Sequence, residues 1–182
     1  ASGGTVGWSD WFYVPYEKSA YDDANDATPT LVDLDADLGL AGVTINALEI
    51  ASLAPADSRT LVLSNGVYGE RMAAMLAAHG RPHEQLAGDW LAPLDLGALE
   101  ARLRADPGIT HVATVHHETT TGRLNDLAAV GALCRRLDRR LLLDAVSSFG
   151  AEEIRFDDWA LAGLAATANK CLHGIPGLCF VV

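Results

Sequence analysis

Residues 140–148 read RLLLDAVSS, a short run of large apolar residues that ends on a carboxylate. Continuous apolar runs of this length are typical of strands buried on both faces, as in parallel sheets that helices cover. Asp144 closes the run, where the strand gives way to a loop. A carboxylate in apolar surroundings needs a cationic or hydrogen-bonding partner, so Asp144 is the first candidate for a functional residue.

The segments on both sides of this strand alternate between strand and helix patterns. Further strands are predicted at 59–64, 110–115, 164–168 and 178–182, and helices at 42–54, 70–80, 94–106 and 125–138. Asn125 is the expected N-cap of the last helix, and a short helical turn is expected around Trp159. This alternation predicts an α/β fold, a three-layer sandwich in which helices cover a mostly parallel sheet.

Composition narrows the class of protein. The chain has 182 residues, of which 49% are hydrophobic, enough for one domain with a substantial core. A net charge of −11 argues against nucleic acid as the main partner.

No apolar stretch is long enough to span a bilayer, and residues 1–30 lack the pattern of a signal peptide. Three cysteines without disulfide or zinc spacing (Cys134, Cys171 and Cys179) indicate reduced thiols, so we expect a cytoplasmic protein.

The first forty residues differ from the rest of the chain. They are rich in aromatic and acidic residues and show no sustained helical or strand period. We therefore expect two parts: an irregular acidic and aromatic arm at 1–40, and the folded domain at 41–182.

Four loops that follow predicted strands carry the unusual residues. In parallel α/β sheets, ligands bind at the carboxyl ends of the strands. These loops contain the amine of Lys170, the carboxylate of Asp144, the hydroxyls of 119–121 and the ring of Tyr68. An amine nucleophile, a carboxylate, hydroxyl donors and an aromatic ring together suit pyridoxal phosphate. Each residue also has a structural interpretation: the threonines as a strand-end turn, and Tyr68 as a core residue at a helix start.

The adjacent histidines His116 and His117 do not indicate a metal site. Neighbouring residues on a strand point to opposite faces, so the two rings cannot easily bind one ion. No metal is therefore expected.

Four motifs carry a resemblance to a known family. NGVYGERM (65–72), HHETTTGRLND (116–126), LLLDAVSSFG (141–150) and ATANKCLHGIPGLCFVV (166–182) resemble, in this order, the class V branch of fold-type I aminotransferases. The resemblance extends over residues 52–182 and implies the large pyridoxal-phosphate-binding domain of that family. It also implies a homodimer, because active sites of fold-type I enzymes are built at a subunit boundary.

The resemblance assigns roles to individual residues. Lys170 is the implied Schiff-base lysine, and Asp144 the implied partner of the pyridinium nitrogen. Thr119 is implied as a hydrogen-bond donor to the cofactor ring or its phenolic oxygen, and Tyr68 as the ring that stacks on it. Asn169 is a candidate for contact with the cofactor phosphate, with an ordinary turn role as the alternative.

Two departures from the family concern the phosphate and the substrate. Relatives carry a GSGT stretch that opens a helix, whose backbone amides hold the cofactor phosphate. At the corresponding positions 40–43 this chain retains only Gly42. The resemblance also implies a smaller C-terminal domain, with an arginine for the substrate carboxylate, that this chain lacks.

Three functions remain open on these grounds. HETTTG and NKCLHGIPG favour transfer of the amino group of 2-aminoethylphosphonate, the amino donor, to pyruvate, a 2-oxo acid, giving phosphonoacetaldehyde and alanine. The alternative within the family is a serine–pyruvate or alanine–glyoxylate type aminotransferase. The changed phosphate loop favours a third possibility, a non-catalytic binding or dimerisation module.

Overall fold

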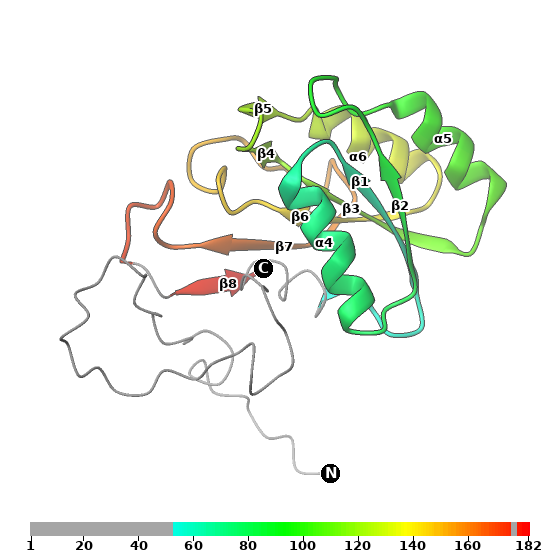
Figure 1. Ribbon diagram of the computed structural model, residues 1–182, viewed down its shortest axis with the longest axis horizontal. Coiled ribbons are helices and arrows are strands. Elements are labelled where there is room, and N and C mark those ends of the chain that lie inside the picture. The colour runs from blue at the N-terminus through cyan, green and yellow to red at the C-terminus, as the bar shows by residue number, and fades with distance from the viewer. Residues whose placement is uncertain (1–52, 176–177) are drawn as a thin grey trace, which may run out of the picture.

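The computed structural model describes residues 53–175 and 178–182. The predicted arm at 1–40 and most of the predicted helix at 42–54 lie outside these residues. The described part forms a six-stranded sheet in the order β2–β1–β3–β6–β7–β8 (Figure 1). Its strands are β1 Arg59–Ser64, β2 His83–Ala87, β3 Ile109–Val115, β6 Arg140–Asp144, β7 Leu161–Thr167 and β8 Cys179–Val181.

The prediction of a mostly parallel sheet is confirmed. Strands β2, β1, β3, β6 and β7 run parallel to their neighbours, and β8 pairs with β7 in the antiparallel direction. A separate two-stranded ladder joins β4 (His117–Glu118) to β5 (Arg123–Leu124). The described helices are α4 Val67–Ala78, α5 Leu96–Ala105 and α6 Leu127–Arg136.

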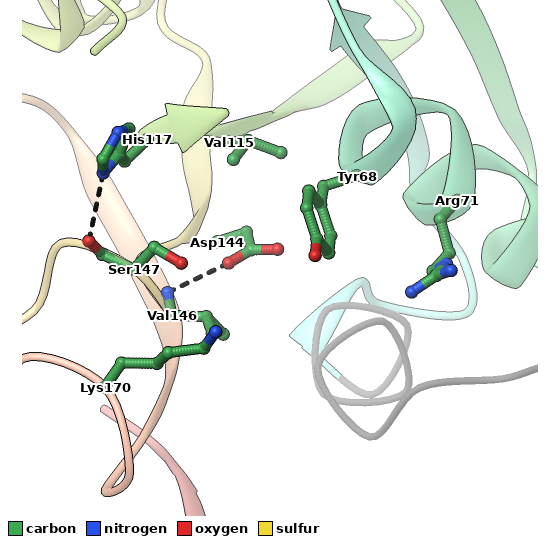
Figure 2. Close-up of a pocket in the computed structure, with 8 residues that line it drawn as sticks. All are labelled: Tyr68, Arg71, Val115, His117, Asp144, Val146, Ser147 and Lys170. Atoms are coloured by element: carbon green, nitrogen blue, oxygen red, sulfur yellow. Dashed lines mark hydrogen bonds between the residues drawn. The ribbon is translucent and has the colours of Figure 1, made fainter. Parts of the chain in front are cut away.

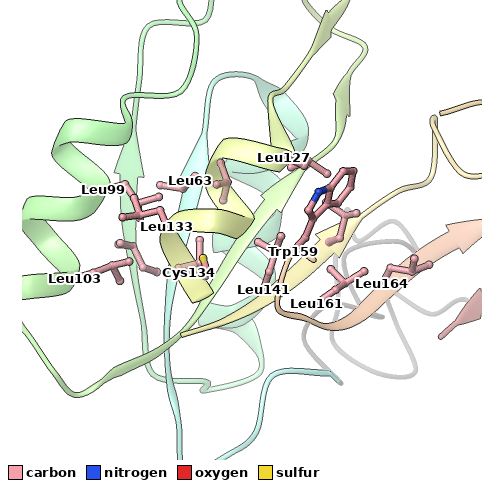
Figure 3. Close-up of a cluster of buried hydrophobic side chains, with 14 of the residues drawn as sticks. Leu63, Leu99, Leu103, Leu127, Leu133, Cys134, Leu141, Trp159, Leu161 and Leu164 are labelled. Atoms are coloured by element: carbon pink, nitrogen blue, oxygen red, sulfur yellow. The ribbon is translucent and has the colours of Figure 1, made fainter. Parts of the chain in front are cut away.

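Helices cover both faces of the sheet and complete the three layers. Leu61 and Leu63 of β1 point into the cluster that contains buried residues of α5 and α6, whereas Val62 points into the cluster beneath α4. Figure 3 shows the first cluster, in which leucines of α5 and α6 pack on the sheet beside Trp159. Because successive residues of a strand face opposite sides, a strand buried on both faces must be apolar throughout.

Helix α6 approaches the segment that precedes β7 very closely. A Cβ placed on Gly131 would lie 2.5 Å from the Cα of Trp159, closer than real Cβ atoms approach other heavy atoms. Trp159 N–H donates to the carbonyl of Arg155 at 3.1 Å, which gives the expected helical turn, and Ala160 ends this turn with φ at 54°. Gly131 therefore sets the distance between α6 and the Trp159 turn.

Several details differ from the sequence prediction. Strand β7 begins at Leu161 rather than at residue 164, and the ladder of β4 and β5 was not predicted. Strand β2 was not expected, because HEQLA is a polar edge strand without an apolar run. Helix α4 begins at Val67 rather than at residue 70. The N-cap of α6 is Asp126, whose Oδ1 accepts the N–H of Ala129 at 3.0 Å, and not Asn125.

Asn125 instead links strand ends inside the protein. Its side-chain amide donates to the carbonyl of Val115 at 2.8 Å and accepts from the amide of Asn65 at 2.8 Å. These buried bonds hold the carboxyl ends of β1 and β3 next to the start of α6.

None of the helices in the described ranges is long and apolar enough to cross a membrane.

Candidate active site

A cavity of about 210 Å³ opens at the carboxyl ends of β3, β6 and β7 (Figure 2). The described residues that line it are Tyr68, Arg71, Val115, His117, Asp144, Val146, Ser147 and Lys170. The cavity is smaller than the pockets of roughly 300–1,000 Å³ that hold drug-sized ligands.

Asp144 is the last residue of β6 and is buried, with 7% of its surface exposed. Its Oδ1 accepts the backbone N–H of Val146 at 3.0 Å. Burial is the main cause that raises the pKa of Asp144 to about 6; the Val146 hydrogen bond opposes this rise, and the charge of Glu118 adds to it. No basic side chain among the described residues forms an ion pair with Asp144. A cation entering the cavity would therefore stabilise this carboxylate.

Lys170 lies in the turn that connects β7 to β8. The N–H of Gly174 donates to the carbonyl of Ala168 at 2.7 Å, and that of His173 donates to the carbonyl of Lys170 at 2.9 Å. His173 adopts a positive φ of 55°, which closes the turn. This turn directs the Lys170 side chain along the cavity wall, with its amine toward Asp144 (Figure 2).

Tyr68 and Arg71 reach the cavity from the first turns of α4. Tyr68 is half-buried, and its ring faces the carboxylate of Asp144 in Figure 2. The guanidinium carbon of Arg71 lies 5.6 Å from the centre of the Tyr68 ring, within the range of a cation–π interaction. The sequence analysis did not single out Arg71, although it lies in the quoted NGVYGERM motif.

Glu118 holds the start of α4 in place, and the sequence analysis missed this role. Its Oε2 accepts the backbone N–H groups of Tyr68 at 3.1 Å and Gly69 at 3.3 Å. Its Oε1 accepts from the hydroxyl of Thr120. A Cβ on Gly66 would overlap the Glu118 side chain, so glycine is needed there for the carboxylate to reach the helix. Two histidines separate Glu118 from the apolar strand β3, so no local pattern in the sequence marks its contact with α4.

His117 is a further residue that the sequence analysis did not place in the site. Its Nδ1 lies 3.3 Å from the carbonyl oxygen of Ser147, and the ring lines the cavity. The adjacent His116 faces the other way and packs edge-on against Trp159, with ring centres 6.0 Å apart. Burial lowers the pKa of His116 to about 4, and His117 adds to the effect, so His116 is neutral at physiological pH.

The structure therefore brings Tyr68, Asp144 and Lys170 together around one cavity. Thr119 is exposed in the turn between β4 and β5, and Asn169 is exposed beside Lys170; neither is among the described residues that line the cavity. Gly42 lies outside the described residues. The roles that the resemblance implies for these three remain predictions.

Comparison with known proteins places the chain in a family. Residues 84–182 match the family model described as aminotransferase class-V. The chain is 40% identical over 144 residues to the 2-aminoethylphosphonate–pyruvate transaminase of Salmonella paratyphi C (strain RKS4594), covering 79% of this chain and 39% of the relative. It is 43% identical over 133 residues to the 2-aminoethylphosphonate–pyruvate transaminase 1 of Cupriavidus pinatubonensis, covering 73% of this chain and 35% of the relative. The chain thus spans less than half the length of these relatives.

Solved structures agree with this placement. Pyridoxamine–pyruvate aminotransferase from Mesorhizobium loti is 32% identical, with a TM-score of 0.64 over 80% of this chain and 36% of that one. Ureidoglycine–glyoxylate aminotransferase from Bacillus subtilis is 27% identical, with a TM-score of 0.67 over 76% of this chain and 35% of that one. The protein belongs to the class V aminotransferases, a family that implies pyridoxal phosphate as cofactor.

The residues around the cavity fit that cofactor. Asp144 is a buried carboxylate without a basic partner in the described part of the chain, which suits a pyridinium nitrogen. Lys170 supplies an amine on the same cavity, and Tyr68 an aromatic face.

Proposed function

We propose that this chain is the cofactor-binding part of a transaminase that moves the amino group of 2-aminoethylphosphonate to pyruvate. One observation carries the proposal: Tyr68, Asp144 and Lys170, which follow three different strands, line the same cavity. Relatives at 40–43% identity that bear this activity in their names support the choice of substrates.

Pyridoxal phosphate, when bound, supplies the electron sink that makes the carbon next to the substrate nitrogen acidic. The carboxylate of Asp144 would hold the proton on the pyridine nitrogen. The Nζ of Lys170 would hold the cofactor and would move the proton away from the substrate carbon. The Tyr68 ring, which lines the cavity, would offer the cofactor an aromatic face.

A second candidate is an alanine–glyoxylate type aminotransferase. The chain is 28% identical to the alanine–glyoxylate aminotransferase from Nostoc, with a TM-score of 0.66 over 75% of this chain and 36% of that chain. The cavity residues described above would serve either reaction, because they handle the cofactor and not the part of the substrate that differs. The amino donor therefore has to be identified by experiment.

The test uses the chain loaded with pyridoxal phosphate. Adding 2-aminoethylphosphonate should convert the bound cofactor and remove its visible absorbance, and pyruvate should restore the absorbance while alanine is formed. Faster conversion with alanine or serine than with the phosphonate would favour the second candidate. Failure of the chain to bind the cofactor through a lysine would contradict both.

We also propose a homodimer in the cytoplasm. The resemblance to enzymes whose active sites form at a subunit boundary supports the dimer. Cys134, Cys171 and Cys179 are not joined to one another in disulfides, which suits a reducing compartment. Sedimentation at working concentrations checks the dimer, and a monomer alone would contradict it.

A further inference from the structure

A second cavity, of about 350 Å³, lies at the edge of the sheet opposite to Asp144 and Lys170. Arg140 and Leu161, the first residues of β6 and β7, both line it. Strand β6 separates Arg140 from Asp144 by about 13 Å, since each residue of a strand adds about 3.3 Å. The volume of this second cavity lies within the range of roughly 300–1,000 Å³ that is usual for sites of small organic ligands.

The end of α6 brings three arginines to this cavity. The N–H of Arg139 donates to the carbonyl of Cys134 at 2.8 Å, and that of Asp138 donates to the carbonyl of Arg135 at 3.2 Å. Together with a φ of 54° at Asp138, these bonds form a common type of helix end. Arg135 in the last turn of the helix therefore shares the cavity with Arg139 and Arg140, which follow the turn.

No carboxylate of the described residues forms an ion pair with any of these three arginines, although five others are paired: Arg59, Arg102, Arg104, Arg136 and Arg155. Instead, Nη2 of Arg135 donates to the backbone carbonyl of Asp157 at 2.6 Å, and Nη1 of Arg139 donates to that of Asp138 at 3.1 Å. A carbonyl orients a guanidinium group without cancelling its charge. The cavity thus keeps positive charge in a protein whose net charge is −11.

The other residues of the second cavity narrow the class of ligand. Guanidinium groups bind phosphate through paired, charge-assisted hydrogen bonds. Asp138 and Asp157 also line the cavity; their carboxylates accept hydrogen bonds from hydroxyl or amino groups and offset part of the positive charge, which favours one phosphate over several. Phe156 is 37% exposed, so its ring is available to pack against a flat ring. One phosphate, hydroxyl and amino donors, and a flat ring are together the features of a nucleoside monophosphate.

We propose that the second cavity binds a nucleoside monophosphate, with the arginines on its phosphate and Phe156 against its base. The site does not involve Asp144 or Lys170, so the inference is independent of the proposed function. The net negative charge of the protein repels anions at long range, so the affinity has to come from these local contacts.

The first experiment compares the binding of AMP, adenosine and inorganic phosphate by isothermal titration calorimetry. AMP should bind at least 10-fold more tightly than either of the other two, because only AMP engages both the arginines and the ring. No binding of AMP to the parent, or equal binding of adenosine or phosphate, would overturn the inference.

Variants then locate the site. Arg140→Gln should weaken AMP binding on the order of 10-fold, because one charge-assisted contact to the phosphate is lost. The described residues make no hydrogen bond or ion pair with the Arg140 side chain, so this variant should fold as the parent does, which thermal unfolding checks. Arg104→Gln is the matched control with the same change in net charge, because Arg104 pairs with Glu100 on the surface of α5. Equal affinity for AMP in Arg140→Gln and in Arg104→Gln would overturn the inference.

Phe156→Leu tests the contact with the base. Leucine keeps the apolar bulk but removes the aromatic face, so AMP should bind about 5-fold or more weakly while inorganic phosphate binds as in the parent. Unchanged affinity for AMP would mean that the base does not lie on Phe156, and the assignment to a nucleotide would be wrong.

His111 gives a second readout that does not depend on affinity. It pairs with Arg140 across β3 and β6. Burial lowers the pKa of His111, the charge of Arg140 lowers it further, and Asp57 opposes both. A phosphate bound at Arg140 offsets that charge, so AMP should raise the pKa of His111 in an NMR titration, and Arg140→Gln should abolish this response. A pKa of His111 that is the same with and without saturating AMP would place the nucleotide elsewhere and overturn the inference.

Discussion

The carboxylate of Glu118 accepts the backbone N–H of Tyr68 at 3.1 Å, across 50 residues of sequence. Glu118 is fully buried and does not itself line the cavity among the described residues. Its hydrogen bonds to the first turn of α4 offset the cost of burying free N–H groups at the helix start. Glu118 thus positions the ring of Tyr68, which lines the cavity, although Glu118 itself does not.

Replacing Glu118 should destabilise the protein through these backbone groups. Glu118→Ala leaves the N–H groups of Tyr68 and Gly69 buried without this acceptor, which costs about 1–3 kcal/mol each. Glu118→Gln keeps the shape of the side chain and one acceptor oxygen, so it should lower the free energy of unfolding by less than Glu118→Ala does. Urea unfolding measures the difference.

The control for this prediction is Glu153→Ala. Glu153 forms an exposed ion pair with Arg155, so its loss should change stability by no more than about 0.5 kcal/mol. A Glu118→Ala variant as stable as this control would show that solvent replaces the carboxylate at the start of α4.

Gly131→Ala should destabilise the protein although alanine is the better helix former. Propensity alone favours alanine by about 1 kcal/mol in a helix interior. The new methyl group would meet backbone atoms of Trp159, which cannot rotate away, so we expect a net loss of about 1–3 kcal/mol. Thermal or urea unfolding checks the sign.

Ala132→Gly on the exposed side of α6 is the matched control. It should lose about 1 kcal/mol by propensity alone, because no packing contact changes. If Gly131→Ala raises stability by as much as Ala132→Gly lowers it, the close approach of α6 to the Trp159 turn is not a packing constraint.

The sequence predicted the central strands because burial on both faces leaves a continuous apolar run. LLL in β6 is such a run, with Leu142 facing α4 and its two neighbours facing α5 and α6. Strand β2 could not be predicted in the same way, because His83–Ala87 lies at the sheet edge and only part of each side chain is buried. Its strand conformation comes from pairing with β1 and not from its own composition.

The sequence predicted the residues of the candidate site whose own side chains have the required chemistry. It did not predict the residues whose role depends on contacts that the fold creates. Lys170 and Asp144 stand out as polar residues at the ends of apolar strands. Glu118 acts through a position that only the fold sets, because it reaches a helix start 50 residues earlier. Such a long-range contact leaves no local pattern in the sequence.

Lys170 should be the residue that binds pyridoxal phosphate covalently. Reduction with borohydride followed by peptide mapping should place the label on the turn between β7 and β8, and Lys170→Ala should remove it. Lys18 is the only other lysine in the chain and supplies the control variant Lys18→Ala, which should label as the parent does. A label that persists in Lys170→Ala would contradict the proposed site.

Asp144→Asn should stabilise the cofactor-free protein, and the size of the gain should depend on pH. The pKa of Asp144 rises from 3.8 to about 6 on folding, mainly through burial, so ionisation of this group opposes folding. Below about pH 4 the carboxyl is neutral in both states and costs nothing. As the pH rises through about 6 the penalty grows toward about 3 kcal/mol, which corresponds to the shift in pKa.

Asparagine removes this penalty and still accepts the N–H of Val146, so Asp144→Asn should be more stable than the parent above about pH 6 and equal to it near about pH 3. Pyridoxal phosphate should reverse the order, because a pyridinium partner stabilises the carboxylate and not the amide. Thermal unfolding across pH, with and without the cofactor, gives both comparisons. A parent that is more stable than Asp144→Asn at about pH 8 without cofactor would mean that Asp144 already has a partner within the protein, and its assignment to the cofactor nitrogen would be wrong.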